Sequence, residues 1–396
     1  MVIREIKKDV YGIIVHDWSR RLFDELIPLP DGTTYNAYFL RGEKNILIDT
    51  ADPVKTDKLL EGLKRVKADR IDYIVSNHSE QDHSGSIPAL LKKFPASKVI
   101  ASEKASGFLK SMLLIPDEKI IRVENGEVLS TGRKSLKFLY APWVHWPETM
   151  VTYCPEDKIL YSCDLFGSHL AESDFYAGCT EKLYFSAKRY YAEIMMPFRN
   201  NISGHLKFIE GLPLDIISPS HGPVYDKPGF ILDAYRDWTS DEVKNEVVLP
   251  YVSMHGSVGK MVDFFTDELI KNGVAVKPFN LTGLDIGELA MALVDAATVV
   301  LGSPTVLAGP HPSALYAAYL FKVLRPKTRF ASVIGSFGWG GNMLKLITDM
   351  LPAKNIELLE PVLIKGYPED SDFTLLKNLA GKIIEKHKQI NPEWKQ

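Results

Sequence analysis

Apolar and polar residues alternate over short runs through the first 246 residues, and longer amphipathic stretches lie between these runs. Alternation with a period of two is typical of strands, and a period near 3.6 is typical of helices. Many strands with intervening helices in one block predict a layered α/β sandwich. We expect strands at residues 35–40, 45–49, 71–76, 98–101, 136–140, 150–153, 158–162 and 215–219. We expect helices at residues 54–66, 86–94, 103–111, 182–195 and 202–210.

The pattern changes after a polar, charged stretch at residues 237–246, which we interpret as a link between two domains. From Val247 onward, apolar runs and amphipathic stretches follow each other regularly, as in repeated βα units. Such units predict a doubly wound parallel sheet. The predicted domains are therefore residues 1–246 and 247–396. In the second domain, strands are expected at 247–252, 274–279, 297–302, 329–335 and 356–364, and helices at 258–272, 285–292, 313–324, 341–351 and 370–387.

Composition and charge narrow the classes of function. A chain of 396 residues with 45% hydrophobic and 24% charged residues fits two ordinary globular domains. A net charge of -3 gives no electrostatic reason to expect nucleic acid or an anionic membrane as a partner. No apolar run approaches the roughly 20 residues that span a bilayer, and no signal peptide is recognised. The three cysteines form no CxxC pair, so we expect a reducing, cytoplasmic setting.

The run His78-Ser79-Glu80-Gln81-Asp82-His83 carries two imidazoles and two carboxylates directly after an apolar run at residues 71–75. In an extended backbone, His78, Glu80 and Asp82 would point into one cavity. A local bend could aim the neighbouring pair Asp82 and His83 at a second point. Any one of these residues alone is compatible with a solvated turn after a strand. Together they favour a binuclear metal site, because metal ligation is the usual reason to crowd such groups.

Three further candidate ligands, His145, Asp164 and His221, each follow an expected strand in the first 246 residues. Strand ends at one edge of a sheet sandwich are places where residues distant in sequence can converge. A single histidine is more often satisfied locally, so each of the three is weak evidence alone. His169, which follows Asp164 closely, is compatible with an outer position near the metal site or with ordinary packing.

These residues resemble the metal site of the flavodiiron proteins, a family with the metallo-β-lactamase fold. Zinc hydrolases of that fold usually carry HxHxDH, with histidine where this chain has Glu80. Zinc favours nitrogen-rich sites, whereas a carboxylate at that place suits a harder metal such as iron. The resemblance implies an αββα sandwich followed by a flavodoxin-like doubly wound sheet. It also implies two iron ions, the first held by His78, Glu80 and His145, the second by Asp82, His83 and His221, with Asp164 bridging the two.

Three loops in the second half resemble the flavin-binding loops of flavodoxins. The first follows the strand expected at 247–252 and opens a helix, where hydroxyls, a glycine and backbone amides form an anion site without a Walker motif. The other two end strands beside the topological switch point, where Trp339 between glycines could stack on an isoalloxazine ring. The candidate FMN-binding residues are Ser253, Met254, His255, Gly256, Ser257, Val258, Ser303, Pro304, Thr305, Ser336, Phe337, Gly338, Trp339 and Gly340.

The chain departs from the flavodoxin-like pattern at two places. Val258 stands where the family commonly has a hydroxyl residue, so one hydrogen bond to the phosphate is expected to be missing. The run Val306-Leu307-Ala308 stands where the family often has two asparagines, which removes polar contacts to the edge of the ring. We expect FMN to bind through the remaining backbone amides.

The two resemblances cover nearly the whole chain, in the order that the flavodiiron family uses. They imply an oxidoreductase that reduces dioxygen to water or nitric oxide to nitrous oxide at a diiron centre, with electrons relayed through FMN. They also imply a head-to-tail homodimer or a dimer of dimers. No fused rubredoxin or reductase domain is recognised, so the expected donor is a rubredoxin-like protein or a reduced deazaflavin coenzyme. We expect dioxygen reduction at least equal to nitric oxide reduction.

Two alternatives stay open on the sequence. One is a zinc-dependent hydrolase with the flavodoxin-like domain as a passenger, against which Glu80 and the flavin loops argue. The other is an electron carrier or redox sensor with a vestigial iron site, against which the complete set of ligands argues. The family resemblance places Tyr191 in the substrate pocket, although core packing explains that aromatic residue equally well.

Overall fold

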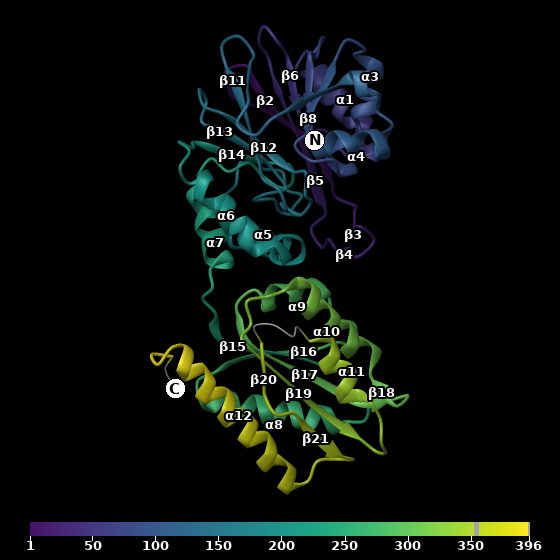
Figure 1. Ribbon diagram of the computed structural model, residues 1–396, viewed down its shortest axis with the longest axis vertical. Coiled ribbons are helices and arrows are strands. Elements are labelled where there is room, and N and C mark those ends of the chain that lie inside the picture. Colours follow the sequence, from purple (N-terminus) through teal and green to yellow (C-terminus); the bar gives the residue numbers. More distant parts are fainter. Residues whose placement is uncertain (352–355, 395–396) are drawn as a thin grey trace. The chain divides into compact units, whose positions relative to one another are not determined.

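The computed structural model describes residues 1–351 and 356–394. The chain divides into two compact units, Met1–Thr239 and Ser240–Gln396, each with its own sheets and helices (Figure 1). Within the described residues, no helix combines the length and the apolar character needed to cross a membrane.

The first unit is built on two sheets. One has seven strands in the order β1-β2-β5-β6-β7-β8-β9, and the other has five in the order β10-β11-β12-β13-β14. The strands of the seven-stranded sheet are β1 (Val2–Lys7), β2 (Val10–Asp17), β5 (Thr33–Leu40), β6 (Ile46–Ile48), β7 (Tyr73–Val75), β8 (Lys98–Ser102) and β9 (Ile120–Val123). Those of the five-stranded sheet are β10 (Val128–Ser130), β11 (Ser135–Tyr140), β12 (Met150–Cys154), β13 (Ile159–Cys163) and β14 (Ile216–Pro219).

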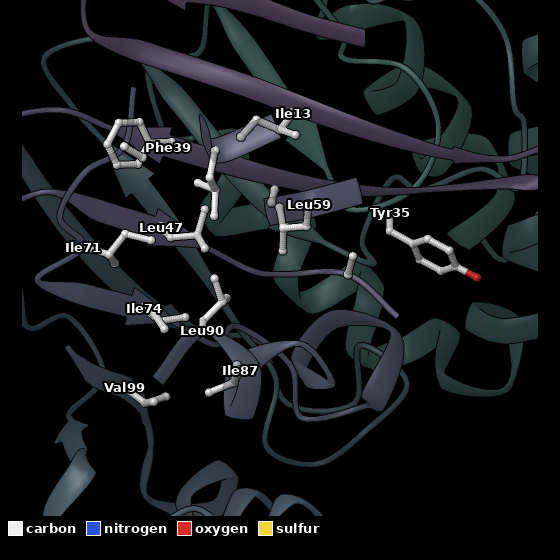
Figure 2. Close-up of a cluster of buried hydrophobic side chains, with 14 of the residues drawn as sticks. Ile13, Tyr35, Phe39, Leu47, Leu59, Ile71, Ile74, Ile87, Leu90 and Val99 are labelled. Carbon is white, nitrogen blue, oxygen red and sulfur yellow. The ribbon is translucent and has the colours of Figure 1, made fainter. Parts of the chain in front are cut away.

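Side chains of the seven-stranded sheet alternate between two cores, as the period of two along a strand requires. Ile13 and Phe39 belong to the cluster between this sheet and its helices, whereas Ile14 and Tyr38 belong to the cluster between the two sheets. Figure 2 shows the first of these clusters, in which Leu59 comes from a helix. The helices that pack in it are α1 (Thr56–Arg65), α3 (Ile87–Lys93) and α4 (Glu103–Leu113).

The five-stranded sheet is covered on both faces, because β12 and β13 are buried along their whole length. Three further helices, α5 (Glu181–Tyr190), α6 (Arg199–Ile209) and α7 (Gly229–Thr239), complete the unit (Figure 1). The predicted sandwich of two sheets with helices outside them is confirmed.

The second unit has a parallel sheet in the order β16-β15-β17-β19-β20, with β21 also paired to β19. Helices α8 and α12 cover one face, and α9, α10 and α11 lie on the other (Figure 1). The predicted doubly wound parallel sheet is confirmed. Its strands are β15 (Lys244–Tyr251), β16 (Ala275–Asn280), β17 (Ala296–Val306), β19 (Phe330–Phe337), β20 (Glu357–Leu358) and β21 (Val362–Lys365). Its helices are α8 (Ser257–Lys271), α9 (Ile286–Leu293), α10 (Pro312–Leu324), α11 (Met343–Met350) and α12 (Asp370–Ile390).

Several elements differ from the sequence-based expectation. The strand expected at 356–364 is divided into β20 and β21, and Pro361 lies in the break, where it lacks the N–H that a ladder needs. The link expected at 237–246 is shorter, because α7 continues to Thr239 and β15 begins at Lys244. The hairpin of β3 (Leu22–Phe23) and β4 (Ile27–Pro28) was not expected, since its strands are too short to carry a pattern.

Candidate metal and flavin sites

The segment after β7 is held by a buried network. Asp49 accepts hydrogen bonds from the backbone N and side-chain Nδ2 of Asn77, at 2.8 and 3.0 Å. The extended backbone expected through Asp82 is wrong, because residues Gln81–Ser84 form a turn of helix, α2. This turn sends Asp82 and His83 toward a different point from His78 and Glu80. The expected division into two points is therefore correct, although its cause is a helical turn.

All seven predicted metal ligands converge in two groups. His78, Glu80, His145 and Asp164 form one group of potential ligand atoms, and Asp82, His83 and His221 form the other. In the first group, Glu80 Oε2 lies 3.1 Å from His78 Nε2 and 3.0 Å from His145 Nε2. In the second group, Asp82 Oδ2 lies 3.1 Å from His221 Nε2, and Asp82 Oδ1 lies 3.3 Å from His83 Nε2.

Asp164 lies between the two groups and directs one oxygen at each. Its Oδ2 is 3.5 Å from His78 Nε2 and 3.3 Å from His145 Nε2. Its Oδ1 is 3.0 Å from His83 Nε2 and 3.4 Å from His221 Nε2. A carboxylate placed in this way can bridge two metal ions.

The chemistry of this donor set fits metal ions. A buried polar atom normally has a hydrogen-bond partner, and leaving it without one is costly. Here several buried atoms that face one another lack such a partner within the protein, as expected of atoms whose partner is a metal ion. They are both carboxylate oxygens of Asp82, His83 Nε2, Asp164 Oδ2 and His221 Nε2.

Outer partners orient the ligand histidines through their second ring nitrogens. His78 Nδ1 lies 2.8 Å from Glu148 Oε1, and His221 Nδ1 lies 2.6 Å from the carbonyl oxygen of Thr34. Such contacts fix the tautomer that leaves Nε2 free to bind a metal. Glu148 was not predicted, because nothing in the run Trp146-Pro147-Glu148 marks it as a partner for a histidine so distant in the chain.

Of the two interpretations left open for Tyr191, its contacts favour core packing, and its neighbour Tyr190 is the tyrosine that reaches the metal groups. Tyr190 donates a hydrogen bond of 2.7 Å from its hydroxyl to Asp164 Oδ1, whereas Tyr191 donates to the carbonyl of Trp238 at 3.1 Å. A π-helical turn, η3 (Tyr191–Met195), begins directly after Tyr190. His169 is buried beside this tyrosine, with ring centroids 4.8 Å apart, so it lies next to the metal groups.

Several residues in and beside the metal groups have a strained backbone. Asp49, Trp143, His145 and Cys163 have φ values of 52°, 68°, 29° and 53°. Residues other than glycine rarely adopt this left-handed backbone conformation, because each such residue costs roughly 1–3 kcal/mol. The conformations persist because tertiary hydrogen bonds hold them. For example, Ser220 N donates to the carbonyl of Cys163 at 2.8 Å. Strain of this kind tends to collect at functional sites.

Carboxylates set the charge of the ligand histidines when no metal is bound. Burial alone would lower the pKa of His145, but the nearby carboxylates of Asp164 and Glu80 raise it to about 9. Burial likewise opposes the charge on His221, and the nearby carboxylates of Asp164 and Asp82 raise its pKa to about 10. Near neutral pH, both imidazoles of the metal-free protein therefore carry protons that a metal must displace.

We expect the metal-free protein to lose stability as the pH rises from 6 to 10. A histidine whose pKa is higher in the folded chain than in the unfolded chain stabilises the fold fully below its unfolded pKa of about 6.5. That stabilisation is lost as the pH rises through the pKa of the folded chain. The free energy of unfolding should fall by several kcal/mol, and the melting temperature by about 10 °C. Thermal unfolding of chelator-treated protein measures it, with metal-loaded protein as the reference.

A matched pair of variants isolates the histidines in this pH dependence. His221→Gln should flatten the profile of the metal-free protein. His205→Gln should leave the profile unchanged, because His205 Nε2 contacts the carbonyl of Pro142 at 2.8 Å and belongs to neither metal group. Equal melting temperatures at pH 6 and pH 10 in the unsubstituted metal-free protein would contradict the assignment.

A cavity of about 510 Å³ lies at the carboxyl ends of the strands in the second unit. Its size falls within the range of small-molecule and cofactor sites, and its position is where open parallel sheets bind ligands. Helix α8 begins there after Gly256, which has a φ of 87° and gives no side-chain cap to the helix amides. A Cβ at Gly338 or Gly340 would meet no protein atom within 4 Å, so a flat ring can approach this loop closely.

Most of the predicted FMN-binding residues line this cavity, and four do not. Ser253 accepts a hydrogen bond from Gly259 N at 2.9 Å, and buried Ser303 accepts one from His311 N at 3.0 Å, so both support the loops. Gly256 and Gly340 are also outside the lining. The residues that line it are Met254, His255, Ser257, Val258, Pro304, Thr305, Ser336, Phe337, Gly338 and Trp339. They are joined by Val306 and Leu307, at the place expected for the edge of the ring, and by Gly366, which was not expected.

Two residues that line the cavity, Trp339 and Val258, differ in their exposure to solvent. Trp339 is 77% exposed, which is unusual for a tryptophan without a function and leaves its ring free to stack. Val258 lies in the first turn of α8 and is buried in the core, so its side chain serves packing and offers no hydrogen bond to an anion.

Similar proteins and structures cover most of the chain. Residues 34–222 match the family described as ODP family beta lactamase. A nitric oxide reductase of Moorella thermoacetica is 34% identical over 387 residues, covering 96% of this chain and 97% of that protein. A coenzyme F420H2 oxidase of Methanothermobacter marburgensis is 33% identical over 371 residues, covering 88% of this chain and 89% of that protein. The structure of rubredoxin oxygen:oxidoreductase from Desulfovibrio gigas aligns with a TM-score of 0.95 at 29% identity, covering 98% and 99%.

Proposed function

The chain belongs to the flavodiiron protein family, and we propose that it binds two iron ions and one FMN to reduce dioxygen to water or nitric oxide to nitrous oxide. The observation that carries the proposal is the pair of metal groups joined by Asp164, with a carboxylate from Glu80 where zinc hydrolases have histidine. Carboxylate-rich donor sets suit iron better than zinc.

Each metal group has a proposed occupant. His78, Glu80 and His145 would hold one iron ion, and the Asp164 carboxylate would link it to the other. Asp82, His83 and His221 would hold the second. When bound, the two ions and FMN supply the electrons for the gas reduction. In this assignment the unit Met1–Thr239 is the diiron domain and the unit Ser240–Gln396 is the FMN-binding domain, so the proposed boundary lies a few residues before the one expected at 246.

The protein's own residues supply position, charge and exclusion of water. Glu148 and the carbonyl of Thr34 hold His78 and His221 in the tautomer that presents Nε2 to the metal groups. The hydroxyl of Tyr190 donates to Asp164 and so holds the bridging carboxylate in its orientation. All three contacts are buried, which limits the access of bulk water to the ligands.

Electrons reach the FMN from an external donor in this proposal. The relatives point to two kinds: one similar protein is a coenzyme F420H2 oxidase and a similar structure is a rubredoxin oxygen:oxidoreductase. We therefore propose a reduced deazaflavin coenzyme or a rubredoxin-like protein as the donor. We also propose a head-to-tail homodimer, or a dimer of such dimers, in which the FMN of one subunit serves the irons of the other.

The proposal predicts that protein prepared without oxygen contains two iron ions and one FMN per chain and consumes both gases. Elemental analysis and an optical spectrum measure the cofactors. Electrodes for dioxygen and nitric oxide, used with the same reduced donor, measure the two activities. We expect the rate with dioxygen to equal or exceed the rate with nitric oxide.

Other outcomes would identify other functions. Colourless protein that contains zinc and cleaves esters or thioesters would be the zinc hydrolase instead. Bound flavin with no metal would indicate an electron carrier. Fast consumption of nitric oxide with negligible uptake of dioxygen would keep the family chemistry and overturn the preference for dioxygen.

A further inference from the structure

One ligand histidine has an unusual outer partner. His78 and His221 each direct Nδ1 at an oxygen, within 2.8 Å of Glu148 and 2.6 Å of the carbonyl of Thr34. His83 instead directs Nδ1 at the sulfur of Cys163, at 3.8 Å. Its other nitrogen, Nε2, is buried without a hydrogen-bond partner and faces Asp82 and Asp164. Ligand atoms of His83, Cys163 and Asp164 lie within 4.8 Å of one another, as a third possible metal-binding group.

Cys163 is held in this place by the fold. It is the last residue of β13 and directly precedes the bridging Asp164. Its backbone has a φ of 53°, and its side chain is fully buried. Ser220, the residue before His221, donates a backbone hydrogen bond of 2.8 Å to the carbonyl of Cys163 and fixes its position. The sulfur therefore stays beside His83 as a consequence of the same strand end that positions Asp164.

A thiol controls the tautomer of an imidazole less firmly than an oxygen acceptor does. Metal binding through Nε2 requires the proton on Nδ1, which must then donate to the outer partner. A carboxylate or carbonyl oxygen can only accept, so it favours that tautomer. A buried cysteine remains a thiol, which accepts weakly and can instead donate its own proton to Nδ1. The second arrangement puts the proton on Nε2 and removes His83 from the ligand set.

We propose that Cys163 is a positioning residue that makes His83 the exchangeable ligand of the second metal group. The inference rests on the proposed function for the identity of the metal, but it concerns how this chain's own residues hold any divalent ion there. His78 and His221, with oxygen partners, stay bound, while His83 can leave and open a coordination position. An oxygen acceptor in place of the thiol should then tighten the second group.

Cys163→Asn tests the proposal, because asparagine offers an amide oxygen and tolerates the left-handed backbone better than most residues. We expect the variant to release one of its two metal ions to a chelator about tenfold more slowly, the lower end of the usual effect of an outer partner. Cys163→Ala, which leaves Nδ1 without a partner, should release the same ion faster. Co²⁺ is the probe, because its visible spectrum also reports the number of ligands.

Two controls separate this role from a merely structural one. Cys179→Asn makes the same substitution at a cysteine with a φ of 50° outside the metal groups, and it should change nothing. In a His83→Ala background, the effect of Cys163→Asn should vanish, because the residue acts through that imidazole. If Cys163→Asn does not fold, Cys163→Asp supplies a carboxylate, which can only accept, and should slow release in the same direction.

The result that would overturn the proposal is equal release by the unsubstituted protein, Cys163→Asn and Cys163→Ala. Persistence of the effect in the His83→Ala background would overturn it as well. These failures differ from failure of the proposed function, which would appear as normal Co²⁺ binding in a protein that reduces neither gas.

Discussion

Asp164→Asn will leave at most one iron ion per chain and lower the rate of gas reduction at least a hundredfold. Asparagine keeps the shape of the side chain and removes the charge that lies within 3.5 Å of four histidine nitrogens. Without that charge, the repulsion between two divalent ions at neighbouring groups is no longer offset. Loss of an outer partner alone costs 10- to 100-fold in affinity or activity, and a shared ligand should cost at least the upper value. Iron analysis and the gas electrodes measure both effects.

Asp226→Asn is the matched control for this substitution. Asp226 is exposed and follows His221 closely in sequence, but it is outside both metal groups. Its replacement should leave iron content, FMN content and both rates unchanged. Two iron ions in Asp164→Asn, with at least half of the original activity, would show that Asp164 does not bridge the groups.

Much of the metal site could be predicted because its signal is local. Four of the seven candidate ligands lie in one short run, and the other three follow strands whose ends meet at one edge of the sandwich. Glu80 needs no structure to be recognised as a departure from the zinc pattern. The split into two groups was also predicted, but the helical turn that produces it was not. A four-residue helix carries too few apolar positions to show a period.

The outer partners could not be predicted, because they depend on contacts between segments far apart in sequence. Glu148 reaches His78 because the amide of Met150 bonds the carbonyl of Asn77 at 2.9 Å and joins the two loops. No spacing rule links these residues. Tyr190 and Tyr191 are adjacent, so one helical step of about 100° decides which hydroxyl reaches Asp164. Only the packing of α5 fixes that rotation.

The fold shows the same division between local and tertiary signals. The repeated βα pattern of the second unit is local, and its sheet was predicted. Strand β2 is harder to recognise, because Gly12 interrupts its run of β-branched residues. The structure gives the reason for this glycine: a Cβ there would approach the ring of Phe175 to 2.4 Å. The sequence does not show that Phe175 packs on this strand.

Glu80→His will move the first metal group from iron toward zinc and abolish gas reduction, while FMN stays bound. The variant carries HxHxDH, so three imidazoles and Asp164 would face one ion, and nitrogen-rich sites favour zinc. One negative charge is also lost beside His78 and His145, whose Nε2 atoms lie 3.1 and 3.0 Å from the Glu80 carboxylate. Grown with equal iron and zinc, the variant should show at least a tenfold higher ratio of zinc to iron and a hundredfold lower rate.

Gln81→His provides the control, because it adds an imidazole one residue away on an exposed position. Its metal content and activity should match those of the unsubstituted protein. Zinc has a single accessible oxidation state, so a zinc-loaded Glu80→His variant that keeps FMN and consumes no gas would show that the metal choice carries the redox function. Retention of iron and activity in Glu80→His would instead mean that Asp82, His83 and His221 select the metal, and that the carboxylate at position 80 is not the determinant.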